Sequence, residues 1–280
     1  MIDLNIPWTP TSDAKAWLSA TRSHGWDSLG FNVYLSADTT GVHDIAIKGL
    51  PESPESTGTS VAVVTTLGRP SPAGSTVIRR VTIVLYDGFQ PNSVNKIIDS
   101  RDYDIVALMP TTQKSFHTAC EVLNCDLINL DYFCHYAQFK VKRGMVTAAL
   151  HRGCFFEVTM STLDHIESLA DTSNRSASDI SRLFRAQLAK VLNYIPLKRL
   201  VLSPGHLHPS SIVDPQTFIG MCNELLCRAT GEICNTRACI TTAPKGCIAK
   251  GAVRRTYGTG IVVHMSGEQL GNRFSAITKT

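Results

Sequence analysis

The sequence predicts an α/β fold in which parallel strands alternate with helices and the sheet closes into a barrel. At least seven short apolar strand patterns are separated by helical patterns, which is typical of a parallel sheet. The 280 residues suffice for one such barrel with insertions, because barrels of this kind run to about 250 residues. The chain is 43% hydrophobic and 18% charged, as expected of a protein that buries a core. The alternation alone predicts a doubly wound sheet nearly as well.

The amino-terminal region predicts a strand, a helix and a second strand. Met1–Ile6 is apolar and ends at Pro7, which cannot donate a hydrogen bond to a strand ladder. A helix follows, with Ser12 as its cap, and ends at Gly25. Leu29–Leu35 then has the pattern of the second strand.

A first insertion is expected at residues 36–76, which are poorly patterned and rich in Ser, Thr, Gly and Pro. We expect one short strand within it, at Ser60–Thr66. The following Val77–Tyr86 segment is the clearest strand of the chain, because it is β-branched, mostly apolar and free of Gly and Pro.

The middle of the chain continues the alternation. Helices are expected at Ser93–Ser100, Thr112–Leu123, Met145–Arg152 and Ser178–Ile195, and strands at Asp104–Met109, Asp126–Leu130, Phe155–Thr159 and Arg199–Ser203. The Ser178–Ile195 segment has an apolar face opposite Arg182 and Arg185, which indicates an amphipathic helix.

The pattern changes in the carboxyl-terminal part. Residues 204–246 are rich in Pro, Ser, Thr and Cys and form a second expected insertion, apart from a helix at Pro215–Cys227. A last helix is expected at Cys247–Met265, with Arg254 and Arg255 exposed on its surface.

Composition bounds the class of protein. A net charge of +4 permits contact with RNA without demonstrating it, because dedicated nucleic-acid domains usually have a larger basic excess. The nine cysteines are expected to be free thiols in a reducing compartment. No apolar run approaches the ~18 residues of a membrane span, and Met1-Ile2-Asp3 lacks the basic start of a signal peptide. We therefore expect a soluble intracellular protein with no membrane partner.

His206-Leu207-His208 is a weak candidate for a metal site. It follows a predicted strand, where a barrel carries its active-site loops, and an extended His-x-His places both imidazoles on one side. The alternative is a surface loop between Pro204 and Pro209 that contains two histidines by chance. Because the sequence shows no clear third and fourth ligand, we expect neither a metal ion nor another cofactor.

A cysteine-rich segment raises the question of zinc. Its members are Cys222, Cys227, Cys234, Cys239 and Cys247. Cys222 and Cys227 are five positions apart on a predicted helix, which turns them about 140° away from each other and disfavours chelation. Buried thiols are the expected state, and a zinc staple stays open as the alternative.

Two carboxylates and one further histidine have structural interpretations. Asp3 and Glu157 both lie on predicted strands, and without histidines beside them we expect buried acceptors for backbone groups or for an arginine. His117 lies beside apolar positions of a predicted helix, so we expect a packed histidine rather than a general base.

Several basic clusters could contact phosphates. The candidate RNA-binding residues are Arg79, Arg80, Lys140, Lys142, Arg143, Arg152, Arg254 and Arg255. Cations of this kind release counterions when they neutralise phosphates, and arginine can also form two hydrogen bonds to one phosphate. Ordinary solvated surface is the alternative for any single residue. The Lys140–Arg143 cluster and Arg152 are the favoured candidates because they lie in one segment.

The opening hexapeptide Asp3–Trp8 carries a family resemblance, and further segments match in the same order. These are Leu29–Phe31, Arg80–Val84, Asp104–Pro110, Lys114–Cys120, Asp126–Ile128 and Arg152–Val158, the last leading into a turn at Asp164. Over residues 1–35 and 77–203 the chain resembles the thirty-kilodalton protein subunit of eukaryotic and archaeal ribonuclease P (RNase P), which is also found in RNase MRP.

The start of the chain also resembles the metal-dependent phosphoesterase barrels of the polymerase-and-histidinol-phosphatase type. Those barrels carry Asp-x-His-x-His where this chain has Asp3, Asn5 and Pro7. Asn and Pro cannot replace the neutral imidazoles of such a site. The resemblance therefore implies a barrel that has kept its scaffold and lost its catalytic ligands.

Together the resemblances imply a TIM-barrel-like fold, irregular and with at least seven strands, as one domain over residues 1–280 with the two insertions. They imply a non-catalytic subunit of RNase P or RNase MRP that supports the catalytic RNA in precursor-tRNA 5′-leader cleavage or precursor-rRNA processing. The implied partners are that RNA, the small α/β-sandwich subunit and other proteins of the complex, in the nucleus and nucleolus.

Two other functions stay open from the sequence. One is a metal-dependent phosphoesterase that uses His206, His208, Asp3 and Glu157. The other is a protein-only interaction scaffold. The sequence does not separate RNase P from RNase MRP, nor the face that meets RNA from the face that meets protein.

Overall fold

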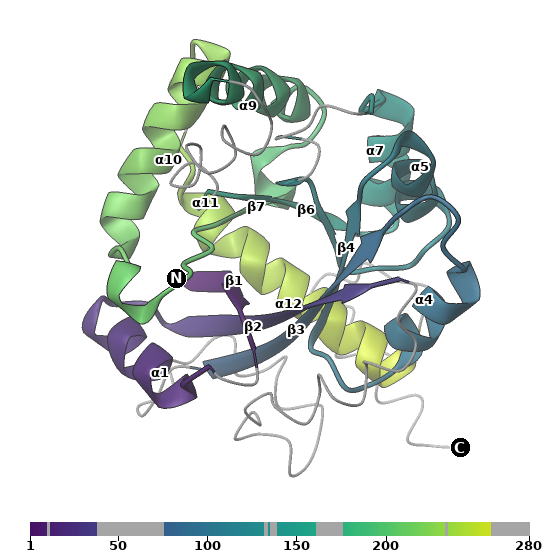
Figure 1. Ribbon diagram of the computed structural model, residues 1–280, viewed down its shortest axis with the longest axis horizontal. Coiled ribbons are helices and arrows are strands. Elements are labelled where there is room, and N and C mark those ends of the chain that lie inside the picture. The colour runs from purple at the N-terminus through teal and green to yellow at the C-terminus, as the bar shows by residue number, and fades with distance from the viewer. Residues whose placement is uncertain are drawn as a thin grey trace, which may run out of the picture.

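The chain forms a parallel α/β barrel. The computed structural model describes residues 1–9, 12–37, 76–131, 134, 139–160, 176–232 and 235–258. Its seven strands are parallel and lie in one sheet in the order of the sequence, β1 to β7, and β7 returns to the side of β1 (Figure 1). A doubly wound sheet would reverse its strand order at a switch point. The order observed here therefore confirms the barrel and excludes the doubly wound alternative.

The strands are short and lie close to their predicted positions. They are β1 (Ile2–Pro7), β2 (Ser28–Ser36), β3 (Thr76–Leu85), β4 (Ile105–Pro110), β5 (Leu127–Asn129), β6 (Phe155–Thr159) and β7 (Leu200–Ser203). The helices are α1 (Ala14–Ser23), α4 (Pro91–Asp99), α5 (Gln113–Glu121), α7 (Arg143–His151), α9 (Ala177–Leu192), α10 (Pro215–Thr230), α11 (Arg237–Ile240) and α12 (Thr242–Tyr257).

Three local predictions differ from the structure. Asp13, and not Ser12, caps α1, because the Asp13 carboxylate accepts hydrogen bonds from two backbone N–H groups of the first turn. The last helix begins earlier than predicted and ends at Gly258, whose φ of 75° suits glycine. The 204–246 segment contains α10, α11 and the start of α12. The strand expected at Ser60–Thr66 lies outside the described residues.

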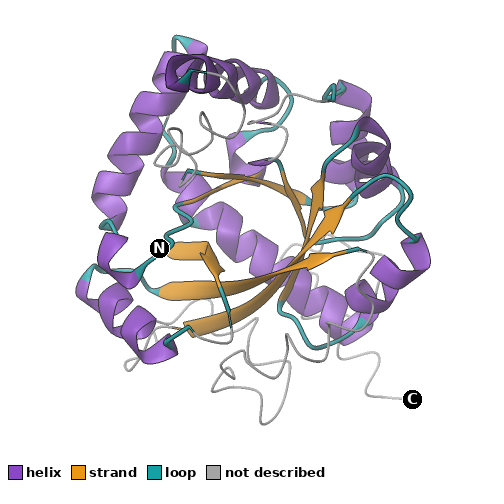
Figure 2. Cartoon of the chain, viewed as in Figure 1, coloured by secondary structure: helices purple, strands orange, loops and turns teal. Residues whose placement is uncertain are grey.

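Alternation along the strands builds two hydrophobic layers. Outward-facing side chains such as Phe31, Ile83 and Phe156 pack against the surrounding helices in the larger layer. Inward-facing side chains such as Leu4 and Ile105 form a smaller layer inside the barrel. Because every strand is covered on both faces, nearly all strand residues are buried, as is typical of parallel sheets (Figure 2).

Helix α12 covers the amino-terminal end of the barrel (Figure 1). Gly251 lies so close to the start of β4 that an added Cβ would be 1.9 Å from the Asp104 carbonyl oxygen. On the same helix the Lys250 ammonium donates to the Cys125 carbonyl (2.6 Å), just before β5. With this end covered, the carboxyl-terminal mouth is the end at which a barrel builds a functional site.

Among the helices of the described ranges, none is long and apolar enough to cross a membrane.

Candidate functional site

A β-bulge in β1 shapes the mouth of the barrel. Asp3 pairs with Leu29 but Ile6 pairs with Phe31, so β1 contains one more residue than β2 over this stretch. The Asp3 carboxylate holds the bulge, because its Oδ1 accepts a hydrogen bond from the Asn5 N–H (3.0 Å). The sequence-based expectation that Asp3 is a buried acceptor for backbone is therefore confirmed.

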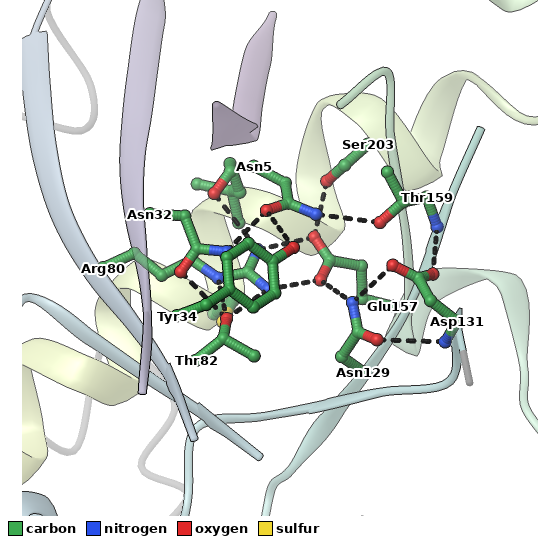
Figure 3. Close-up of polar contacts among 12 residues, drawn as sticks. Asn5, Asn32, Tyr34, Arg80, Thr82, Asn129, Asp131, Glu157, Thr159 and Ser203 are labelled. Carbon is green, nitrogen blue, oxygen red and sulfur yellow. Dashed lines mark hydrogen bonds and ion pairs between the residues drawn. The ribbon is translucent and has the colours of Figure 1, made fainter. Parts of the chain in front are cut away.

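Gly30 on β2 makes room for the bulge. A Cβ added at Gly30 would lie 2.7 Å from the Leu4 carbonyl oxygen, so a side chain there would push the two strands apart. That carbonyl oxygen accepts a hydrogen bond from Arg80 Nη1 (3.1 Å). The bulge thereby presents both a backbone acceptor and the Asn5 side chain to the barrel interior (Figure 3).

A buried ion pair crosses the barrel at its centre. Arg80 on β3 donates two hydrogen bonds to Glu157 on β6, at 2.6 Å from Nη1 to Oε1 and 2.5 Å from Nη2 to Oε2 (Figure 3). Both side chains are 0% exposed. Burial opposes ionisation of Glu157, but the Arg80 charge and the hydrogen bonds to the carboxylate hold the Glu157 pKa below its usual range. The expectation that Glu157 serves a buried arginine is confirmed.

Polar residues on other strands form further hydrogen bonds with Arg80 and Glu157. The remaining acceptor capacity of Glu157 is used by Ser203 (2.6 Å) and Asn129 (2.9 Å). Thr82 accepts from the guanidinium of Arg80 and donates to Asn32 (2.9 Å). A satisfied network of this kind avoids the large cost of an unpaired buried charge.

Asn5 connects this network to the rim of the mouth. Its amide nitrogen donates to Thr159 (2.8 Å), and its Oδ1 accepts from Asn32 (2.6 Å) and from the Tyr34 hydroxyl (3.1 Å). The Tyr34 hydroxyl points inward, and its burial raises the Tyr34 pKa to about 12, whereas the residue as a whole is 41% exposed. The rim therefore presents an aromatic ring whose hydroxyl is anchored in the interior.

Two carboxyl groups at the mouth have raised pKa values. Burial, together with the negative charge of Glu157, raises the pKa of Asp3 to about 7 and that of Asp131 to about 6. Asp131 accepts from the Thr159 N–H (2.7 Å) and from the Asn129 side-chain amide (2.9 Å). Both carboxyl groups thus act as hydrogen-bonded structural groups of the mouth.

The residues at the mouth do not fit a divalent metal ion. The guanidinium of Arg80 lies beside Glu157, and a fixed positive charge there repels a second cation. Asn5 Oδ1 already accepts hydrogen bonds from Asn32 and from the Tyr34 hydroxyl, so it is not available as a metal ligand. Within the described ranges, no three His, Cys, Asp or Glu side chains are grouped as metal ligands.

The two histidines of the weak metal candidate have different environments. His206 is 8% exposed and packs edge-on against Trp26, with ring centroids 6.4 Å apart. Burial lowers the His206 pKa to about 4, which keeps the imidazole neutral. His208 is exposed, and its Nδ1 forms a hydrogen bond with Ser210 (2.9 Å). The structure therefore gives His206 a packing contact and His208 a local turn contact.

The cysteine and His117 predictions had mixed outcomes. Buried thiols are confirmed at Cys222, Cys239 and Cys247, whereas Cys227 is exposed and Cys234 lies outside the described residues.

The prediction of a packed His117 is wrong. Its side chain is 55% exposed and pairs with Glu121 one turn later on α5 (3.2 Å).

Two of the candidate RNA-binding arginines are buried, which corrects the sequence-based assignment. Arg80 holds Glu157 and is 0% exposed. Arg254 is 5% exposed, and its Nε donates to Asp126 (2.9 Å) while its other nitrogens bind carbonyl groups, including that of Tyr103 (3.0 Å). Neither guanidinium is on the surface, so neither can reach a phosphate.

Three further candidate arginines have structural contacts within the barrel. Arg152 donates to the Ala119 and Cys120 carbonyls at the end of α5 (2.8 and 2.6 Å). Arg79 and Arg255 flank Asp104 at the amino-terminal end, with contacts of 3.8 and 2.7 Å. These residues are partly buried, and their charges are compensated by carbonyl dipoles or by a carboxylate.

The remaining candidates, Lys140, Lys142 and Arg143, are exposed at the carboxyl-terminal end of the barrel. They lie at the start of α7, which runs from the mouth down to β6 (Figure 1). The structure brings these three together with Lys114 of α5, because the Lys140 N–H donates to Gln113 at the start of that helix (2.7 Å).

Sequence reasoning missed most of the interior network. Asn32, Thr82, Asn129 and Ser203 were not identified as site residues. Their signal is the period of two along each strand, which places Thr82 on the same face as Arg80, Asn129 on that of Leu127 and Ser203 on that of Val201. Polar residues that face the interior of several strands at one level indicate a shared site.

Comparison with curated proteins finds several relatives, one of which is named as a ribonuclease P subunit. Ribonuclease P protein subunit p30 of Mus musculus is 30% identical over 140 residues, which is 50% of this chain and 48% of the mouse protein. Protein GAMETOPHYTE DEFECTIVE 1 of Arabidopsis thaliana is 32% identical over 130 residues, 46% of this chain and 20% of that protein. The matched region thus spans about half or less of these relatives.

Comparison with solved structures finds the same fold. A chain of a cryo-EM structure of archaeal Ribonuclease P with mature tRNA matches with a TM-score of 0.55 and 15% sequence identity, covering 95% of this chain and 99% of that chain. At this identity the likeness shows the barrel fold alone. The family described as RNase P subunit p30 matches residues 1–256. Because this match covers nearly the whole chain, the protein belongs to the RNase P subunit p30 family.

Proposed function

We propose that the chain is a non-catalytic protein subunit of a ribonuclease P or RNase MRP ribonucleoprotein. In this role the RNA carries the catalytic site, and the barrel supports the RNA during precursor-tRNA 5′-leader cleavage, precursor-rRNA processing or both. Family membership supports the assignment to this class of complex. The mouse relative that carries the subunit's name is matched over about half its length.

The Arg80–Glu157 pair is the observation that carries the non-catalytic part of the proposal. The two side chains fill the barrel centre, next to the β1 segment in which Asn5 and Pro7 replace the histidine ligands of the phosphoesterase barrels that the sequence resembles. Because the ion pair satisfies its own charges, the mouth offers little net negative charge to attract a metal ion. This argues against the alternative of a phosphoesterase built on Asp3, Glu157, His206 and His208.

The exposed cations at the start of α7 support contact with RNA. Lys140, Lys142 and Arg143 are exposed, and no salt bridge joins them to a carboxylate within the described part of the chain. The backbone N–H groups at the start of α7 have no side-chain cap, so the positive end of the helix dipole adds to these charges. Phosphates bound here would release counterions and give salt-dependent affinity.

The wider setting is also part of the proposal. The subunit would act in the nucleus or nucleolus and pair with the small α/β-sandwich subunit and other proteins of the complex. A rigid barrel held by that partner would fix the position of its cations, so that RNA phosphates are neutralised in a defined geometry.

Purification of the endogenous protein tests the proposal directly. The expected result is a structured RNA of the RNase P or RNase MRP type together with basic proteins, with the RNA lost at high salt. Recovery of the protein without RNA, or hydrolysis of a phosphoester by the RNA-free protein with added Mn²⁺, would contradict the non-catalytic role.

Charge reversal tests the location of the RNA contact. The triple variant Lys140→Glu, Lys142→Glu and Arg143→Glu should release RNA at a lower salt concentration than the unmodified chain. A matched control reverses three exposed lysines at the opposite end of the barrel: Lys96, Lys198 and Lys245. Equal RNA retention by the two triple variants would refute the α7 location and leave the family assignment intact.

A further inference from the structure

Three loop segments form one continuous strip on the rim of the barrel. They are Leu85–Asp87 at the end of β3, Thr111–Lys114 at the start of α5, and Lys140–Arg143 at the start of α7. We refer to these residues as the β3–α5–α7 rim. All three follow the carboxyl-terminal ends of strands, and α5 and α7 lie side by side (Figure 1).

Hydrogen bonds hold the three segments in register. The Thr111 hydroxyl donates to the Leu85 carbonyl (2.9 Å), and the Thr112 hydroxyl donates to Asp87 (2.6 Å). The Lys140 N–H donates to the Gln113 side-chain oxygen (2.7 Å). The rim is therefore a preorganised surface rather than three independent loops, and little ordering is needed when a ligand binds to it.

An aromatic side chain lies at one end of the rim. Tyr86 is 47% exposed although both its neighbours are fixed, Leu85 by Thr111 and Asp87 by Thr112. Tyr34, 41% exposed, lies on the adjacent strand β2, whose register places it opposite Thr82 of β3. Exposed tyrosines on held backbone provide stacking surfaces at low conformational cost.

Positive charge occupies the other end of the rim. Lys114, Lys140, Lys142 and Arg143 are exposed, and no carboxylate of the described ranges forms a salt bridge with any of them. Asp87 is the acidic group of the rim, and one of its oxygens accepts the Thr112 hydroxyl. The surface thus combines a π-face with a row of cations, the pair of features that binds single-stranded nucleic acid.

We propose that the β3–α5–α7 rim binds an unpaired RNA segment, with a base stacked on Tyr86 and successive phosphates on Lys114 and the Lys140–Arg143 cluster. The inference rests on the proposed function and goes beyond it by naming the conformation of the RNA. In an A-form duplex each base is stacked between its neighbours inside the helix, so its face is not open to a side chain. A tyrosine ring on a rigid rim can stack only on a base that is free of its own helix.

Binding of short RNAs to the 280-residue chain tests the inference. The probe is a fluorescent oligouridylate of about 12 nucleotides, within the range bound by such surfaces, compared with a duplex RNA of the same length. The single strand should bind more tightly than the duplex. Tyr86→Ala should weaken single-strand binding about tenfold, and Tyr86→Phe should retain it, because the ring and not the hydroxyl makes the contact.

The salt dependence separates stacking from charge neutralisation. Lys114→Gln should reduce the slope of log affinity against log salt concentration by about 0.7, the value for one phosphate of a single strand. Tyr86→Ala should lower affinity without changing that slope. Tyr257→Ala is the matched control, because Tyr257 is 68% exposed and ends α12 at the opposite end of the barrel.

Cross-linking in the endogenous particle distinguishes failure of this inference from failure of the proposed function. Ultraviolet cross-links to unpaired nucleotides should fall on peptides that contain Tyr86, Lys114 or Lys140–Arg143. Cross-links confined to other peptides, equal affinity for duplex and single strand, or an acidic protein surface seated on the rim would overturn the inference while the ribonucleoprotein role stands. A particle without RNA would overturn both.

Discussion

Arg80 and Glu157 face each other across the barrel and form a two-hydrogen-bond ion pair at 2.6 and 2.5 Å, with neither side chain exposed. The pair joins β3 to β6, strands separated by two others in the sheet, so it fixes the cross-section of the barrel. Its neighbours Asn129, Ser203 and Thr82 leave neither charge without a hydrogen bond.

Removing one partner of the pair should be strongly destabilising. Arg80→Met leaves Glu157 as a buried unpaired charge and should reduce the free energy of unfolding by about 3–5 kcal/mol. The double variant Arg80→Met/Glu157→Leu should recover much of that loss, because no charge is then buried. Urea denaturation of the four proteins of the double-mutant cycle measures the coupling. A double variant that is less stable than both single variants would contradict this account.

The free energy of unfolding should fall as the pH rises, because Asp3 loses a proton that the folded state binds. Its pKa in the folded protein, about 7, lies above the unfolded value of 3.8, so between these values the folded state binds more protons. The contribution of Asp3 is therefore full below about pH 4 and is lost as the pH rises through 7, at up to about 1.4 kcal/mol per pH unit.

Asp3→Asn isolates this contribution. The asparagine side-chain oxygen can still accept the Asn5 N–H that holds the bulge, but it does not titrate. The difference in unfolding free energy between the two proteins, measured from pH 4 to 8, should change in favour of the variant up to about pH 7 and then level off. His206 and Asp131 titrate in both proteins and cancel in this difference. A difference that is constant with pH would show that Asp3 is ionised throughout.

Two adjacent arginines of α12 should have unequal effects on stability. Arg254→Met leaves the Asp126 carboxylate buried without its cation, and we expect a loss of about 3–5 kcal/mol. Arg255→Met should cost about 1 kcal/mol or less, because its side chain is 27% exposed and Asp104 keeps its contacts with Arg79. Thermal unfolding of the two variants provides the comparison. If the Arg254→Met protein were fully stable but bound RNA poorly, Arg254 would have to contact RNA at the surface, and its structural assignment would be wrong.

Two glycine-to-alanine substitutions in helices should have opposite signs. Gly251→Ala places a Cβ 1.9 Å from the Asp104 carbonyl oxygen and should cost about 3 kcal/mol as α12 is displaced. Gly220→Ala in α10 meets no atom within 4 Å and should stabilise the protein by about 0.5–1 kcal/mol, the usual gain in a helix interior. Calorimetry on both variants checks the signs. Equal effects would mean that α12 does not press against β4.

The sequence determined the order and type of the elements, because short-range patterns carry that information. The β-branched, mostly apolar run Val77–Tyr86 and the apolar face of Ser178–Ile195 are patterns of residues close together in the sequence, and β3 and α9 lie where those patterns predict. The replacement of two histidines by Asn5 and Pro7 likewise followed from the sequence alone. Family membership was predicted from short motifs that occur in the same order as in the family, and the family comparison confirms it.

Only the tertiary structure decided which charged residues are available on the surface. Arg79 and Arg80 are neighbours in sequence, yet successive residues of a strand face opposite sides, so Arg80 lies inside the barrel with a partner 77 positions away. Arg254 is buried because α12 crosses the amino-terminal end, a long-range contact that no local pattern encodes. The alternation of strands and helices, together with the family resemblance, predicted the barrel and its altered β1 motif. The packing of distant strands decided that a guanidinium fills its centre, and that the exposed members of the candidate RNA-binding set are Lys140, Lys142 and Arg143 at the start of α7.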